Sequence, residues 1–153
     1  MQLSTRASAL LQELARDHGL KSLDFDRDGL IPMKIRETQT SIAYSPANDS
    51  FYLMAIVDVD AGGRLADPWA ALKANGPLAA RRTRLAIDPN TKAVVLVRDI
   101  FLAGLAYWQF AKAIEEFLAD FDRVAAGYVR AAATDAGAGL SADVPSDYLT
   151  FRA

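Results

Sequence analysis

Three aspartates and a glycine early in the chain have the spacing of a calcium-binding loop. Asp24, Asp26, Asp28 and Gly29 match the opening D-x-D-x-D-G of an EF-hand loop, in which carboxylates bind calcium. Such a loop needs a bidentate glutamate at its twelfth position, but the sequence has Ile35 there, inside a segment that alternates like a strand. We therefore interpret the aspartates as an acidic turn.

Side chains for other catalytic or metal chemistry are few. The chain has no cysteine and one histidine, His18, so zinc sites, cysteine–histidine pairs and histidine-based triads lack their parts. Two carboxylate pairs remain: Asp58 with Asp60 at a strand end, and Glu116 with Asp120 on one helix face. We interpret both pairs as solvated charges, because no partner group is predicted beside them. We expect no cofactor and no metal.

The composition is that of one soluble globular domain. The chain has 153 residues, of which 52% are apolar and 24% charged, and its net charge is −2. Without a basic excess to neutralise phosphates, nucleic acid is not an expected partner. The one basic run, residues 81–84, is interpreted as a solvated strand face.

Several features predict a cytoplasmic protein. The lack of cysteine fits a reducing compartment. The N-terminal residues have no apolar run before a small-residue cleavage site, so we expect no signal peptide. The longest apolar run, residues 100–110, is too short to span a bilayer, and no membrane association is expected.

The first half of the chain predicts a helix followed by three strands. Ser4 or Thr5 can cap the helix, and Gly19 has the position of its left-handed C-cap. The apolar positions that share one helix face are Ala7, Leu10, Leu11, Leu14 and Ala15. Alternating segments predict strands at residues 31–37, 40–45 and 51–59. The third is apolar on both sides, which predicts a central strand that is covered on both faces.

The second half predicts a short helix, a hairpin and a long helix. Residues 69–75 follow an Asp-Pro start signal and precede Gly76-Pro77, a stop signal. Strands at 83–87 and 93–98 flank a turn at 88–91.

The long helix, residues 106–130, is amphipathic. Its apolar stripe comprises Tyr107, Phe110, Ala111, Ile114, Phe117, Leu118, Phe121, Val124, Ala125 and Tyr128. The opposite side, expected to face water, carries Gln109, Lys112, Glu115, Glu116, Asp120, Asp122 and Arg123. Because the stripe is wider than a coiled-coil seam, we expect this helix to lie across a sheet of its own subunit.

Together these elements predict an α+β fold of order α-β-β-β-α-β-β-α. Hairpin-length turns favour a mostly antiparallel, twisted sheet covered by the long C-terminal helix. Residues 1–131 form the predicted single domain. Residues 132–153 are rich in Ala, Gly, Ser and Asp, and we expect a flexible tail.

Over residues 11–129 the sequence resembles the Tir chaperone (CesT) family, the small dimeric chaperones of type III secretion. The resemblance rests on the order and spacing of several loose motifs. These are Asp17-His18-Gly19-Leu20, residues 23–30, the second hairpin at 45–54, Pro68-Trp69-Ala70-Ala71-Leu72-Lys73-Ala74-Asn75, Leu85-Ala86-Ile87-Asp88-Pro89, and the amphipathic last helix.

The resemblance implies a bacterial cytoplasmic homodimer without enzymatic activity. It would bind the N-terminal segment of a secreted effector protein in extended form and keep it export-competent without ATP. By position, Trp69, Ala70 and Leu72 would lie at the dimer interface. The candidate effector-binding residues are Leu11, Leu14, Met33, Ile35, Ile42, Tyr44 and Met54, which would form shallow apolar patches beside an added strand.

Two other functions remain open at this point, because a fold does not determine a function. One is a non-enzymatic regulatory domain with the same fold that binds a peptide or protein. The other is a small enzyme that uses Asp58 or Asp60 in a cleft at the sheet end. A partner with a disordered N-terminal segment would favour the chaperone, and a deep polar pocket around Asp58 would favour the enzyme.

Overall fold

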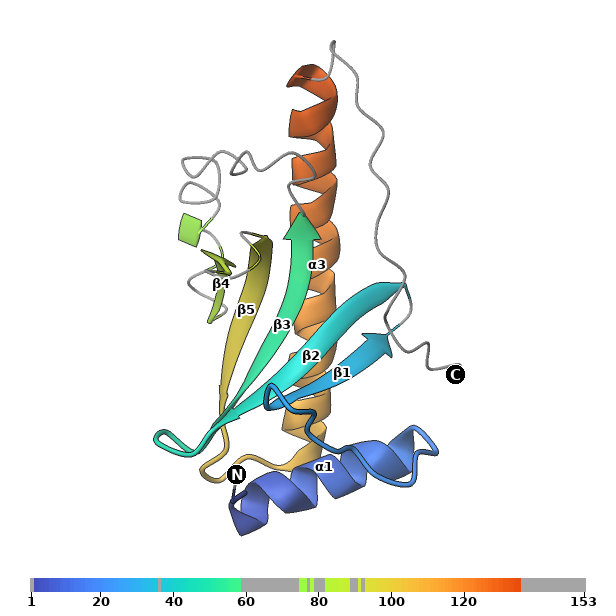
Figure 1. The fold of residues 1–153 in the computed structure, drawn as a ribbon, viewed down its shortest axis with the longest axis vertical. Coiled ribbons are helices and arrows are strands. Elements are labelled where there is room, and N and C mark those ends of the chain that lie inside the picture. Colours follow the sequence, from blue (N-terminus) through green and yellow to red (C-terminus); the bar gives the residue numbers. More distant parts are fainter. Residues whose placement is uncertain are drawn as a thin grey trace.

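The computed structural model describes residues 2–35, 37–58, 75–76, 78, 82–88, 91 and 93–135. Its elements are α1 (Thr5–Asp17), β1 (Leu30–Ile35), β2 (Thr38–Ser45), β3 (Ser50–Asp58), β4 (Thr83–Ile87), β5 (Val94–Phe101) and α3 (Tyr107–Asp135). The strands form one antiparallel sheet of order β1-β2-β3-β5-β4, shown in Figure 1. The α+β class, the antiparallel sheet and the central third strand are therefore confirmed.

Helix α1 begins and ends as the sequence predicts. The Ser4 side chain accepts a hydrogen bond of 3.1 Å from the Ala7 amide at the N-terminus. At the C-terminus Gly19 has φ +66°, a left-handed conformation that glycine adopts at low cost, and the Leu20 amide donates to the Ala15 carbonyl. The buried residues are the five predicted apolar positions, Ala7, Leu10, Leu11, Leu14 and Ala15.

One face of the sheet, here called the helix face, contains the core. A row of paired residues crosses this face from edge to edge: Ile31, Ile42, Leu53, Arg98 and Thr83. The three apolar members of the row are at most 2% exposed and belong to one cluster with the buried residues of both helices. The alternation of the strands therefore sends the same face of all five strands toward the helices.

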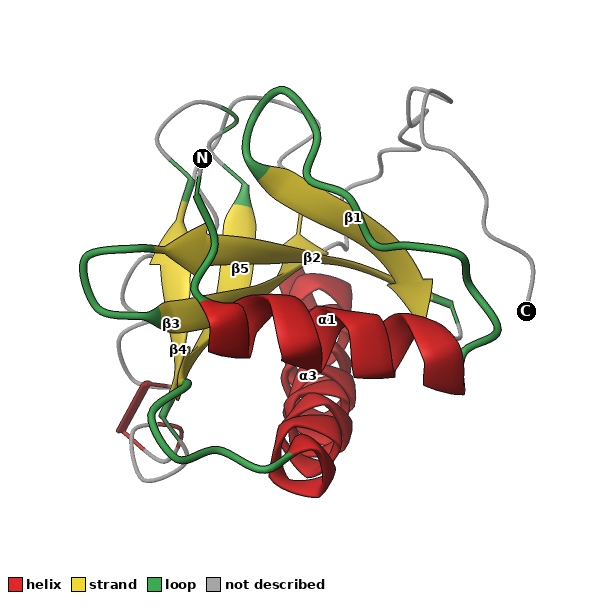
Figure 2. Cartoon of the chain, turned by 90° about the horizontal axis from the view of Figure 1, so that it is seen from below, coloured by secondary structure: helices red, strands yellow, loops and turns green. Residues whose placement is uncertain are grey.

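Helices α1 and α3 both pack on the helix face. Figure 2 shows α1 crossing the end of α3 below the sheet. The Tyr107 hydroxyl of α3 donates to the Asp17 carboxylate of α1 at 2.6 Å, and burial together with this bond raises the pKa of Tyr107. Helices α1 and α3 thus lie on the same face of the sheet. The prediction that β3 is covered on both faces is wrong at Ile56, because this side chain is 38% exposed on the opposite face.

Helix α3 spans 29 residues, about 44 Å at 1.5 Å per residue, and runs along the sheet behind β3. Among its described side chains the buried apolar ones are Phe110, Ile114, Phe117 and Leu118, all from the predicted stripe. The helix ends at Asp135 rather than at Arg130. The domain boundary at residue 131 stays a prediction, and residues 136–153 lie outside the described part.

The predicted short helix, residues 69–75, lies outside the described residues except for Asn75. Asn75, Gly76 and Leu78 are α-helical, so the predicted end at Gly76 is wrong. Leu78 is buried in the core, and the Asn75 side chain bonds both backbone groups of Leu85. These tertiary contacts outweigh the low helix propensity of glycine.

Candidate functional site

The face of the sheet opposite the helix face, here called the outer face, has an apolar centre. Strand pairing places Ser41, Met54, Val97 and Arg84 in one row across it, with Pro32 at the β1 end. Among the described residues no helix packs against this row. Val97 in this row is only 7% exposed and Met54 is half-buried, so the accessible apolar part of the outer face lies on β3.

The central strand supplies the accessible apolar side chains of this face. Tyr52 and Met54 are half-buried, and Ile56 is 38% exposed, opposite Val95 of β5. Three alternate residues of one strand thus present a continuous apolar line in a sheet whose other face is core. An exposed apolar line of this kind is typical of a surface that binds another protein segment.

The structure separates the seven candidate effector-binding residues into two groups. Leu11, Leu14, Ile42 and Tyr44 lie in the core, at most 9% exposed. The Tyr44 hydroxyl accepts from the Ser4 amide and donates to the Asp49 carboxylate, so its polar end is engaged as well.

The remaining three residues keep accessible surface but lie on different sides of the sheet. Met33 and Ile35 are half-buried beside the core at the edge strand β1. Met54 is on the outer face, in the middle of the sheet. The seven residues therefore do not form one patch, and two accessible sites remain, one at β1 and one at Met54.

The candidate dimer-interface residues Trp69, Ala70 and Leu72 lie outside the described residues. The described strand next to them in sequence, β4, is an edge of the sheet and pairs only with β5 in the described part. Ile87 on this strand is 39% exposed. The Asn75 side chain occupies both backbone groups of Leu85 in the middle of this strand, so the β4 edge offers apolar surface at Ile87 rather than an open row of backbone groups.

The aspartates of the first loop form a turn, as predicted. The Asp26 carboxylate accepts hydrogen bonds from the amides of Asp28 at 2.9 Å and Leu30 at 2.8 Å, and Gly29 has φ +75°. Asp26 therefore holds the backbone that leads into β1. In the described residues no group of three or more His, Cys, Asp or Glu could hold a metal ion.

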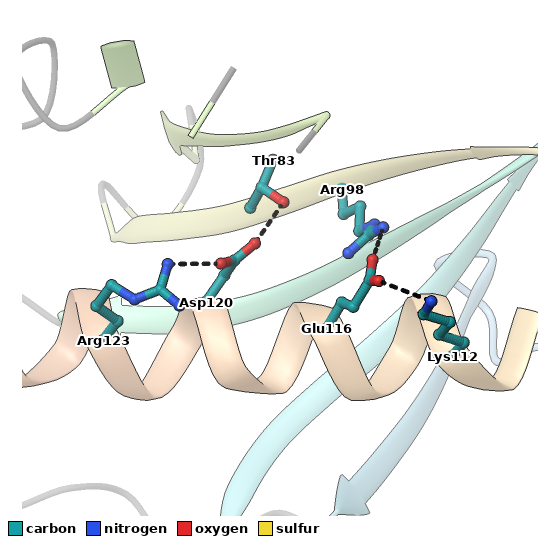
Figure 3. Close-up of polar contacts among 6 residues, drawn as sticks. All are labelled: Thr83, Arg98, Lys112, Glu116, Asp120 and Arg123. Carbon is teal, nitrogen blue, oxygen red and sulfur yellow. Dashed lines mark hydrogen bonds and ion pairs between the residues drawn. The ribbon is translucent and has the colours of Figure 1, made fainter. Parts of the chain in front are cut away.

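The structure corrects the prediction of a solvated charge for Asp120, whereas the Glu116 side chain is 44% exposed. Asp120 is fully buried on the helix face, where its carboxylate accepts from the Thr83 hydroxyl at 3.1 Å and from Arg123 at 3.1 Å, as Figure 3 shows. Glu116, one turn earlier, pairs with Arg98 of β5 at 2.7 Å. Both carboxylates therefore fasten α3 to the β4–β5 side of the sheet.

The sequence carried a signal for the buried aspartate that the amphipathic pattern obscured. Asp120 follows Phe117 by three residues and precedes Val124 by four, so it lies between two residues that face the core. Arg98 carried a similar signal, since it alternates with the buried Leu96 and Ile100. Polar residues at core-facing positions indicate buried polar contacts, which here are Asp120 with Thr83 and Arg98 with Glu116.

The described helices contain none that is long and apolar enough to cross a membrane. Of the carboxylates weighed for catalysis, Asp60 and the side chain of Asp58 lie outside the description. The other two, Glu116 and Asp120, are engaged in the contacts above.

Comparison with known proteins places the chain among secretion chaperones. The model of the Tir chaperone protein (CesT) family matches residues 9–124. No curated protein matches the chain.

Solved structures of similar fold include three complexes. The HopA1–SchA chaperone–effector complex has a TM-score of 0.63 and 16% identity, with 76% of this chain and 91% of that chain covered. The ExsC–ExsE complex has a TM-score of 0.62 and 23% identity, with 85% and 96% covered. The type III secretion chaperone SycH of Yersinia pestis, in complex with a fragment of YscM2, has a TM-score of 0.55 and 18% identity, with 76% and 97% covered.

Proposed function

The chain belongs to the Tir chaperone (CesT) family, and from this we propose that it is a type III secretion chaperone for a secreted effector protein. It binds the N-terminal segment of the effector in extended form and keeps that segment soluble and export-competent without ATP. The observation that carries the proposal is the family match over residues 9–124, on a sheet and helix arrangement shared with solved chaperone complexes.

The outer face and the β1 edge supply the surfaces that this function needs. An extended segment presents alternate side chains about 7 Å apart, which matches the spacing of Tyr52, Met54 and Ile56 along β3. Met33 and Ile35 offer a second apolar site at the other side of the sheet. Several weak apolar contacts spread over the chaperone hold a segment unfolded without a deep pocket.

We also propose that the protein acts in the bacterial cytoplasm and is not an enzyme. Membership of a chaperone family supports both statements. The engagement of Glu116 and Asp120 in structural contacts removes one of the two carboxylate pairs available for acid–base chemistry. The effector-binding role needs no cofactor.

We propose that the protein is a homodimer. The two copies would be joined through the segment of Trp69, Ala70 and Leu72 and through the β4 edge. Contact between two β4 edges would cover the exposed side chain of Ile87. Size-exclusion chromatography with light scattering is expected to give a mass near twice 16.6 kDa. A monomer at all micromolar concentrations would contradict this state.

Met54→Asp is expected to leave the chain folded but to weaken effector binding at least tenfold, because it places a charge in the apolar line of the outer face. The measurement is co-purification and calorimetry with the secreted protein that is encoded beside the chaperone gene. In contrast, Ile42→Asp is expected to unfold the chain, since Ile42 is fully buried.

Ala119→Asp, an exposed position on α3, serves as the matched control and is expected to bind like the wild type. If the neighbouring secreted protein forms no complex with the wild-type chain, the proposed function loses its support. If Met54→Asp binds the effector like the wild type, the effector does not bind at the outer face.

A further inference from the structure

Arg82, immediately before β4, has a backbone conformation that an arginine rarely adopts. Its φ is +57°, and it is one of two described non-glycine residues with positive φ. The other, Asp49, is explained by its turn, since its carboxylate accepts from Tyr44 and its carbonyl accepts from the Leu102 amide. The Arg82 carbonyl accepts only a long bond of 3.4 Å from the Asp99 amide. Strain that local contacts do not account for is often kept where a side chain has a function.

This conformation places the Arg82 guanidinium over an exposed aromatic ring. The guanidinium carbon lies 5.6 Å from the centroid of Phe101, which is 50% exposed at the end of β5. A guanidinium that stacks on an aromatic ring is held in one orientation. The N–H groups at the edge of the guanidinium remain free to donate hydrogen bonds. Arg82 and Phe101, here called the Arg82–Phe101 pair, thus form one surface feature.

Two described arginines near Arg82 are already neutralised. Arg84 pairs with Asp99 at 2.6 Å, and Arg98 pairs with Glu116 at 2.7 Å. Within the described residues Arg82 has no carboxylate within ion-pair distance. In the described part of an acidic chain of net charge −2, Arg82 is therefore an oriented arginine whose charge is not neutralised by a neighbour.

Two hollows meet at the pair. One, of about 360 Å³, lies between β5 and the first half of α3 and is lined by Leu105, Gln109 and Ala113 among others. The other, of about 450 Å³, lies along β4 and includes Asn75 and Thr83. Arg82, Asp99 and Phe101 line both hollows. A chain that crosses the pair can place one side chain on it and a neighbouring side chain in each hollow.

We infer that the Arg82–Phe101 pair anchors an acidic residue of the bound effector segment, with apolar or small residues on either side. This inference rests on the proposed function and names the chemistry of its partner. The guanidinium matches a carboxylate with two parallel hydrogen bonds, and the ring of Phe101 covers the aliphatic part of the same residue. The pair adds charge recognition to the apolar contacts of the outer face and fixes the register of the segment.

Arg82→Asn tests the anchor without disturbing the backbone, because asparagine is among the residues that tolerate positive φ. Calorimetry with the purified N-terminal segment of the co-purifying effector is expected to show affinity reduced about ten- to hundredfold, the usual effect of losing a charged hydrogen bond. Arg82→Lys is expected to recover part of the affinity. Arg27→Asn, which removes the same charge from an exposed turn, is expected to bind like the wild type.

Changing each Asp and Glu of the effector segment to its amide identifies the partner residue. One such change is expected to weaken binding to the wild-type chain as much as Arg82→Asn does, and to cause no further loss in that variant. Unchanged affinity of Arg82→Asn would overturn the anchor while the chaperone function stands. If light scattering shows that Arg82→Asn is a monomer, the anchor is also overturned, because the pair would then contact a second copy of the chain instead of the effector. If the wild-type chain binds no effector segment, the proposed function itself fails.

Discussion

Phe110→Ala is expected to lower the free energy of unfolding by about 3–5 kcal/mol, the largest effect among the alanine substitutions considered for this protein. Phe110 is fully buried in α3, and its ring centroid lies 5.5 Å from that of Phe51 in the central strand. Truncation removes the apolar contact and leaves a cavity between helix and sheet that the rigid β3 cannot fill. Urea unfolding followed by circular dichroism, at one fixed protein concentration, measures the change.

Trp108 provides the matched control, because it is a larger aromatic residue on the same helix but is 66% exposed. Trp108→Ala is expected to change the free energy of unfolding by less than about 0.5 kcal/mol. Equal effects of the two truncations would show that α3 does not lie on the sheet through the Phe110 side.

Asp120→Ala is expected to destabilise the chain by about 2–3 kcal/mol through a polar mechanism. The substitution removes an acceptor from the hydroxyl of Thr83, which is 1% exposed and cannot turn to water instead. It also releases Arg123, although that side chain is 58% exposed and its share is small. Thermal and urea unfolding should both report the loss.

The double variant Thr83→Val/Asp120→Leu distinguishes the contribution of the Thr83–Asp120 hydrogen bond from the contribution of packing. Replacing both partners by apolar side chains removes the hydroxyl together with its acceptor, so the double variant is expected to be more stable than Asp120→Ala alone. Arg123→Ala is expected to cost less than about 1 kcal/mol. A cost for Asp120→Ala no larger than that for Arg123→Ala would contradict the role of the Thr83 contact.

The local structure of the chain could be predicted because its signals are local. Ser4 caps α1, Gly19 ends it, and the alternation of apolar residues identifies the strands themselves. The hairpin between β4 and β5 follows from a turn in which the Thr91 hydroxyl donates to Asp88. Strand pairing and the α+β class then follow from short connections.

The arrangement of the helices and the candidate site could not be predicted from these signals. Periodicity shows that Leu11 and Ile42 each have an apolar environment, but it does not show whether a helix of the same chain or a partner provides it. The structure shows that α1 and α3 share the helix face, which buries both residues. Arg82 and Phe101 are 19 positions apart, and only the pairing of β4 with β5 brings them together.

The two edges of the sheet are protected against open-ended strand pairing in different ways. Strand β1 carries an exposed Pro32, which has no amide hydrogen to donate, and Lys34, whose charge opposes close approach of another strand. Strand β4 has no proline within its bounds, but the Asn75 side chain bonds both the amide and the carbonyl of Leu85 in the middle of the strand. A further strand would have to displace this side chain before it could pair along β4. Both edges therefore oppose growth into fibres, a useful property in a protein that holds an unfolded segment.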